Sequence, residues 1–372
     1  RREHVLRAAE LYRLALDHGS WNDTQRLSLL TRLGDALANR GRCVDAARTY
    51  LQGVPLAGSA ERLELHRRAA TQYMISGHVD RGLASMNRAL RAVDVRPPVR
   101  GWSAMPSLVL QRSLLRLLGT GFRPTSAGGN PPETLARVDF CHSVAMCLYK
   151  TDTVGASTFV SLACLLALDS GDPLRVARAL AMEAANTAGG GSEVRRQVER
   201  HLTASEAIVR RLDTPYMWGI FRLARGMACL FMGDFAEGVN ATLTAEEILR
   251  TRCVGTEWEL STANEGVLWG LYWMGEIQRL NRHYERVSRA AEARGNIVYR
   301  FNLGSVAVST RLLEHDRPRQ AHAEVDRLWD DMRRHYNRLP DVSFLQCVTS
   351  RANIELYGGH GPRAWQIVSE AW

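Results

Sequence analysis

Glycine followed by a polar residue interrupts this 372-residue chain at regular intervals, and this spacing constrains the fold more than any other feature. Between the breaks, apolar residues recur at spacings of three and four, which is the period of an α-helix. No segment shows the alternation typical of a β-strand. The turn positions 233, 275, 316 and 359 are 42, 41 and 43 residues apart. Such a period predicts stacked helix pairs, because one pair cannot bury its apolar face alone.

The clearest unit lies between Leu33 and Tyr50. Gly34 and Ala46 are small, so two antiparallel helices can approach closely there, and Gly41 permits the turn between them. Tyr50 then fills the space against the next pair. These residues resemble the signature positions of the tetratricopeptide repeat. We therefore predict an all-α fold, a right-handed superhelical solenoid of antiparallel helix pairs.

The unit recurs along the chain. Its small-residue and turn positions return at Gly77, Gly82, Gly226, Gly233, Gly275 and Gly359. We predict three segments: N-terminal repeats over 1–98, a connecting helix with a Gly/Pro-rich loop over 99–132, and C-terminal repeats with longer helices over 133–372. The middle segment fits a boundary between two solenoids and a kink in a single superhelix equally well.

The charge and the cysteine content restrict which classes of partner and which cellular compartment we expect. The net charge is +9, yet Asp and Glu interleave with the arginines, so no basic stripe is seen and we expect no nucleic-acid partner. Seven cysteines form no CxxC pair, which favours a reducing, cytoplasmic setting over a disulfide framework or a zinc site. The uncharged run from Val154 to Leu168 is shorter than the roughly 18 residues of a membrane span. We expect no membrane partner.

Catalytic motifs are absent from the sequence. It contains no GxxxxGK[ST], GxGxxG, HExxH or GxSxG pattern and no kinase catalytic loop. The Gly189–Gly191 turn with Ser192 could offer backbone N–H groups to an anion, with Arg195 nearby, but a capped helix turn is the favoured interpretation. We expect no catalytic residue, no metal and no cofactor.

An aromatic pattern gives the best candidate for a binding surface. In tetratricopeptide solenoids the first helix of each pair lines the concave groove. The repeat positions that face it correspond here to Met227, Leu230, Phe231, Trp269, Tyr272 and Trp273. Such a groove could hold a peptide or an apolar small molecule. The favoured alternative is that long helices in a tight superhelix close over this face and bury it as core.

Several segments resemble one family more specifically. They are 73–83, 91–98, 175–185, 189–191 and 253–260. Together they resemble the C-terminal helical region of large bacterial serine/threonine protein kinases that also carry a STAND-type ATPase module. The resemblance implies a sensor or docking arm that binds a protein or a small effector, with kinase and ATPase modules upstream in the same chain. Both ends of the sequence fall within predicted helices, which suggests a fragment.

Two other roles remain open at this stage. One is a scaffold that associates with itself through its repeats, and the other is an effector-binding arm of a large transcription regulator. An enzyme is the least favoured class, because nothing in the sequence resembles a nucleophile, a metal cage or a cofactor loop.

Overall fold

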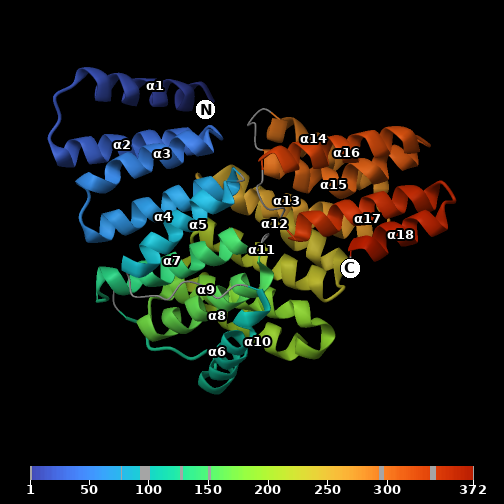
Figure 1. Cartoon of the computed structure of the whole chain (residues 1–372). Helices are drawn as coiled ribbons and strands as arrows, with labels where there is room; N and C mark the ends of the chain where they lie inside the picture. The colour runs from blue at the N-terminus through green and yellow to red at the C-terminus, as the bar shows by residue number, and fades with distance from the viewer. Residues whose placement is uncertain are drawn as a thin grey trace. The chain divides into compact units, whose positions relative to one another are not determined.

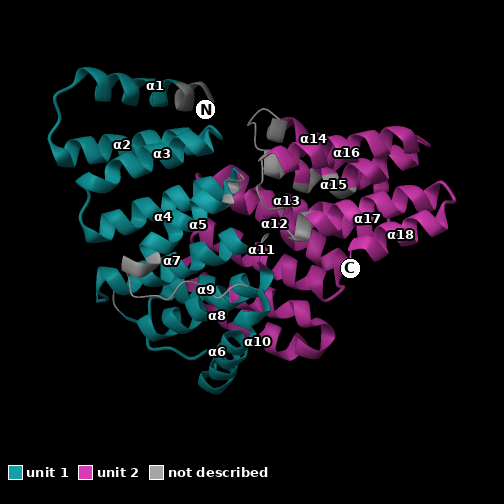
Figure 2. Cartoon of the chain, viewed as in Figure 1, with its two compact units in different colours: residues 1–149, 153–179 teal, residues 150–152, 180–372 magenta. Residues whose placement is uncertain are grey.

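A computed structural model describes residues 2–76, 78–92, 101–125, 129–149, 152–292, 297–335 and 341–371. Within these ranges the chain forms helices and no strand. It packs into two compact units, unit 1 (residues 1–149 and 153–179) and unit 2 (residues 150–152 and 180–372) (Figure 2). The predicted all-α fold of antiparallel helix pairs is confirmed. The handedness and the segment limits at 98 and 132 stay predictions.

Unit 1 is built from helices that pack against their neighbours in sequence (Figure 1). Its elements are α1 (Arg2–His18), α2 (Asp23–Asn39), α3 (Cys43–Gly53), η1 (Val54–Leu56), α4 (Ser59–Ile75), α5 (Val79–Ala92), η2 (Gly101–Ala104), α6 (Met105–Leu118), α7 (Pro132–Leu148), α8 (Thr153–Ser170) and the start of α9 (Pro173–Thr187). The pairs are α2/α3, α4/α5 and α7/α8, and the first helices α4 and α7 also touch.

Unit 2 repeats this arrangement with longer helices. It holds the rest of α9, then η3 (Ala188–Val194), α10 (Arg195–Leu212), α11 (Pro215–Phe231), α12 (Phe235–Arg252), α13 (Glu257–Trp273), α14 (Ile277–Glu292), α15 (Ile297–Glu314), α16 (Pro318–His335), α17 (Asp341–Tyr357) and α18 (Gly361–Ala371). The first helices of successive pairs, α11, α13, α15 and α17, stack on one another.

One turn conformation joins the helices of most pairs. Positive φ angles occur at Gly41, Gly233, Gly275, Asp316 and Gly359, each between the two helices of a pair. The residue after the turn donates its N–H to a carbonyl five residues back, as Asp234 does to Cys229 at 2.9 Å. These bonds satisfy carbonyl groups at the end of the first helix. Gly77, assigned to the same turn from the sequence, lies outside the described residues.

Small residues let paired helices approach. A Cβ on Gly226 of α11 would lie 3.1 Å from the carbonyl oxygen of Gly238 on α12, and the reverse contact is also 3.1 Å. Gly82 of α5 is held in the same way against Met74 of α4, where a Cβ would lie 2.6 Å from the side chain. Ala46 of α3 is fully buried.

Helix α8 is longer than the uncharged run that the sequence suggested. It covers Thr153–Ser170, and among the described residues it alone is long and apolar enough to cross a membrane by length and composition. In this structure 56% of it is buried inside the protein, where it packs on α7 and α6 in the manner of a core helix.

Candidate functional site

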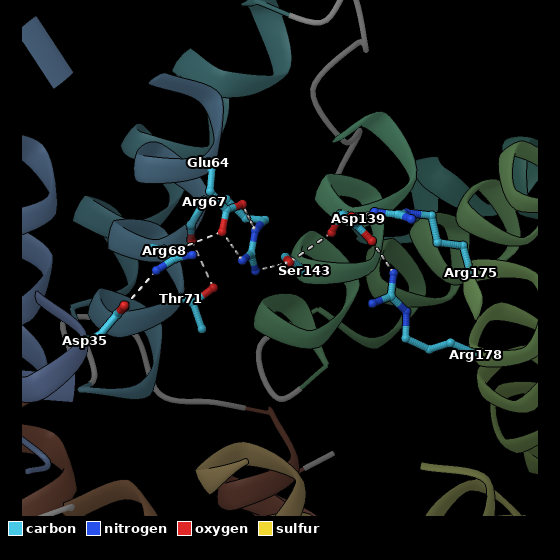
Figure 3. Close-up of polar contacts among 9 residues, drawn as sticks. All are labelled: Asp35, Glu64, Arg67, Arg68, Thr71, Asp139, Ser143, Arg175 and Arg178. Carbon is cyan, nitrogen blue, oxygen red and sulfur yellow. Dashed lines mark hydrogen bonds and ion pairs between the residues drawn. The ribbon is translucent and has the colours of Figure 1, made fainter. Parts of the chain in front are cut away.

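Charged side chains on successive first helices form a connected row in unit 1, which we call the charged ladder (Figure 3). Its members are Asp35 on α2, Glu64, Arg67 and Arg68 on α4, Asp139 and Ser143 on α7, and Arg175 and Arg178 on α9. The spacing of three and four residues on α4 places its three charged members on one helix face. The ladder therefore follows one side of the helix array from α2 to α9.

Glu64 is the centre of the first half of the ladder. Both of its carboxylate oxygens accept hydrogen bonds from Arg67 at 2.6 Å, and Oε1 also accepts one from Arg68 at 2.7 Å. Arg68 reaches on to Asp35 at 2.7 Å. Burial would raise the pKa of Glu64, but the hydrogen bonds and charges of the two arginines outweigh it and lower that pKa below its ordinary value. Glu64 is thus held as a carboxylate, and the two-pronged contact fixes the orientation of Arg67.

Arg67 links α4 to the second half of the ladder. Its Nη1 donates to Ser143 Oγ at 3.0 Å, and that hydroxyl donates to the backbone carbonyl of Asp139 at 2.9 Å. The Asp139 carboxylate accepts from Arg175 and from Arg178, each at 2.5 Å. The Arg178 and Arg175 side chains are only 12% and 20% exposed, so these ion pairs are largely shielded from water.

A pocket of about 270 Å³ opens between α4 and α7, directly beside the charged ladder. Four ladder residues line it: Glu64, Arg67, Asp139 and Arg175. The remaining lining is apolar and consists of Ala60, Leu63, Pro132, Leu135, Ala136 and Phe140. An apolar floor with a few fixed polar groups is the usual composition of a ligand site.

This site was not predicted from the sequence, because interleaved charges on helices are usually solvated surface. The available signal was the Glu64, Arg67 and Arg68 spacing on a first helix, where the repeat places the inner face. This spacing does not indicate which other helix the side chains contact. The hydrogen bond from Arg67 to Ser143 joins residues that are 76 positions apart in the sequence.

The aromatic residues predicted from the repeat register lie on α11 and α13 of unit 2. Leu230 is buried, Met227, Phe231, Trp269 and Tyr272 are half-buried, and Trp273 is 56% exposed. The rings of Phe231 and Trp269 meet edge to face with centroids 6.1 Å apart. Trp273 stacks on Phe235 of α12 at 6.3 Å. The structure therefore gathers these aromatic rings, and Trp273 is the most accessible of them.

Helix α17 covers part of this aromatic face. Asn353 Nδ2 on α17 donates to Tyr272 Oη on α13 at 2.8 Å, and Gln346 of α17 donates to Glu265 of α13 at 3.4 Å. Both contacts span 81 residues of sequence and pass α15, which lies between these two first helices in the stack. The polar side chains of α17 therefore reach α13 at Tyr272 and at Glu265.

The Gly189–Gly191 turn and Arg195, the possible anion site in the sequence, are part of an ordered connection between α9 and α10. The Gly189–Gly191 turn forms η3, with a positive φ of 73° at Gly191, and Arg195 beside it forms an ion pair with Asp234 at 2.6 Å. In the part of the chain that the structure describes, no three His, Cys, Asp or Glu side chains gather in a way that could hold a metal ion.

No protein-family model matches the chain, and no curated protein matches it. Among solved structures, it is similar to a signal transduction ATPase with numerous domains (STAND) from Pyrococcus horikoshii that has a tetratricopeptide repeat sensor. The identity is 12% and the TM-score 0.39, and the match covers 93% of this chain and 52% of that protein. The chain thus spans about half the length of that solved protein.

Proposed function

We propose that this chain is a non-catalytic helical-repeat region that binds a protein partner through the pocket between α4 and α7. The observation that carries the proposal is the apolar floor of the pocket beside fixed charged groups on the first-helix side of unit 1. Pockets that hold drug-sized molecules are commonly about 300–1,000 Å³. The smaller volume here suits one apolar side chain of a peptide segment.

The charges of the ladder support a peptide over a strongly charged small molecule. Three carboxylates, on Asp35, Glu64 and Asp139, face four guanidinium groups, and each guanidinium has a carboxylate partner through the ion pairs above. A ligand of high net charge would have to displace these partners. A peptide backbone needs only donors and acceptors at the rim, while an apolar anchor enters the pocket and supplies most of the binding energy.

An array of peptides of about 12 residues, each with one central apolar residue, tests this proposal when probed with the labelled full chain. We expect a subset with a shared apolar anchor to bind. Ala136→Trp fills the pocket and should abolish that binding. Gln52→Trp, at an exposed position on α3, is the matched control and should leave binding unchanged.

Two outcomes would contradict the proposal. One is a chain that selects no peptide. The other is selection that survives Ala136→Trp while circular dichroism shows the variant to be folded, since the pocket would then be irrelevant to binding.

The resemblance to STAND-containing protein kinases supports a place for this region in a larger signalling protein. We infer that it acts as the sensor or docking arm of kinase and ATPase modules upstream in the same chain, in the cytoplasm. Reading the complete gene on both sides tests this. A kinase catalytic loop and a P-loop upstream are expected, whereas a DNA-binding helix-turn-helix would favour the arm of a transcription regulator. A reading frame with only further repeats would favour a self-associating scaffold.

The exposed Trp273 stacked on Phe235 favours a second contact surface, in unit 2, for the same or another partner. It would take an apolar or aromatic group of the partner, since a half-exposed indole is an effective anchor in protein interfaces. Trp273→Ala should weaken partner capture, while Trp365→Ala, at another exposed tryptophan, should not.

A further inference from the structure

Helix α6 of unit 1 exposes an unusually apolar face. Along η2 and α6 the exposed large apolar side chains are Trp102 (82% exposed), Val109 (57%), Leu110 (61%), Leu114 (40%), Leu117 (83%) and Leu118 (66%). Single exposed leucines are common on protein surfaces, but a contiguous group on one short helix marks an interaction site.

The geometry of α6 separates a packed side from an open side. Leu108 and Leu115 are buried, 6% and 2% exposed, where the helix packs on α8. Leu110, Leu114 and Leu117 follow one another at spacings of four and three, so they lie together on a different face. The packed side is enough to hold α6 on unit 1, and the open side is therefore free to contact something else.

The surrounding charge indicates what that partner is. From residue 95 to residue 132 the sequence contains five arginines and neither Asp nor Glu. Two of the arginines, Arg112 and Arg116, lie on α6 itself, and Arg123 is exposed just after it. Elsewhere in the chain acidic and basic residues interleave, so this stretch is a local excess of positive charge. A basic helix with a leucine-rich face and a tryptophan at its start has the composition of helices that lie in a membrane interface.

We propose that the open face of α6 rests on an anionic lipid surface. Its leucines and Trp102 would enter the boundary between headgroups and acyl chains, and the exposed Arg116 and Arg123 would lie at the lipid phosphates. A flat bilayer accepts a convex single helix without a preformed groove. A second copy of this chain would instead bring arginines against arginines. This proposal departs from the expectation of no membrane partner, because that expectation rested on the lack of a spanning segment and a helix that lies on the surface does not span.

Cosedimentation of the full chain with lipid vesicles tests the proposal. The two vesicle types are pure phosphatidylcholine and phosphatidylcholine with roughly one-third phosphatidylserine. We expect binding at least about tenfold tighter to the anionic vesicles, weakening as salt rises because screening shortens the range of the charge contacts. On binding, the tryptophan fluorescence should shift to the blue, and Trp102→Phe should reduce that shift.

The double variant Leu110→Asp/Leu117→Asp should weaken vesicle binding by at least about tenfold, because both side chains would enter the bilayer. The matched control is Leu11→Asp/Leu14→Asp on α1, whose leucines are 56% and 53% exposed, and it should bind normally. Circular dichroism verifies that both variants fold.

Three results would overturn the proposal. Failure of the wild-type chain to sediment with anionic vesicles is the first. The second is equal loss of binding in the α1 control, which would show that the face of α6 is not specific. The third is a dimer that light scattering detects without vesicles and that dissociates in the α6 variant but not in the α1 control. The open face of α6 would then bind a second copy of the chain. None of these results bears on the peptide pocket, which lies between α4 and α7.

Discussion

The ring of Tyr50 on α3 lies directly against the Cα of Gly34 on α2, so that a Cβ at position 34 would come within 2.4 Å of the ring. Tyr50 is only 3% exposed, and its hydroxyl donates to Asp35 at 2.7 Å. The absence of a side chain at Gly34 therefore creates the space that the tyrosine fills. This contact sets how closely the two helices of the first complete pair approach.

We expect Gly34→Ala to lower the free energy of unfolding by about 2 kcal/mol, because the new methyl group overpacks a buried site. Urea unfolding followed by circular dichroism measures the change. Gly121→Ala is the control, since a Cβ there would meet nothing within 4 Å. Equal stability of Gly34→Ala and the wild type would mean that the α2/α3 pair can open without cost, contrary to the packing seen here.

The turn before α18 gives a second prediction with a control two residues away. Gly359 has a φ of 76°, a conformation that costs residues with a Cβ about 1–2 kcal/mol. Gly361, at the start of α18, has open space around it and an ordinary φ. Gly359→Ala should thus lower the free energy of unfolding by about 1–2 kcal/mol, and Gly361→Ala should leave it unchanged or raise it slightly. Loss of stability in both variants would place the effect in α18 and not in the turn.

These two relationships also explain why the fold was predictable. A positive φ and a close helix approach both demand glycine, and such demands are local, so the sequence records them at Gly34 and Gly359. Asp316 has the same turn conformation with a φ of 54°, and the spacing of the repeats located it without a glycine. The helix pairs follow from these positions and from the apolar period between them.

The candidate sites depend on contacts that no local pattern records. Arg175 meets Asp139 across 36 residues, and Asn353 meets Tyr272 across 81. The first contact joins successive first helices, α7 and α9, and the second passes over one helix pair, from α13 to α17. The helical period also assigns Tyr272 and Trp273 to the same surface. In the structure, however, Tyr272 is hydrogen-bonded to α17, whereas Trp273 is 56% exposed. The sequence could therefore indicate that an inner face exists, but not which of its residues stay accessible.

Asp139 is the residue of the charged ladder whose loss should cost most. Asp139→Ala would leave Arg178 and Arg175, 12% and 20% exposed, without their shared carboxylate. Removing one partner of a buried ion pair costs more than the pair contributes, so we expect a loss of about 2–3 kcal/mol.

Asp326 provides the matched comparison. It accepts from Arg351 at 2.6 Å, but the side chains are 54% and 33% exposed. Asp326→Ala should cost less than about 1 kcal/mol, because water replaces the lost partner. Chemical unfolding of both variants decides the matter. Similar losses would show that the arginines of the ladder are as well hydrated as a surface pair.

His283 on α14 predicts an acid-sensitive stability in unit 2. The residue is 7% exposed, and Nε2 lies 2.9 Å from Asn264 Oδ1 while Nδ1 lies 3.2 Å from Arg286 Nη2. This arrangement suits a neutral ring that donates to Asn264 and accepts from Arg286. Burial, followed by the charge of Arg286, lowers the pKa of His283 to about 4, and Glu246 of α12 opposes this only in part.

The sign of the pH effect follows from this lowered pKa. Between the ordinary pKa of 6.5 and about 4, the unfolded chain binds a proton that the folded chain does not. Stability should therefore be fully present above pH 6.5 and fall as the pH drops toward 4, by about 3 kcal/mol from this residue. His283→Gln should flatten that part of the curve, whereas His315→Gln, at an exposed position, should not. If His283→Gln also keeps the wild-type slope, His283 takes up its proton equally well in the folded and the unfolded chain, and its contact with Arg286 cannot be as described.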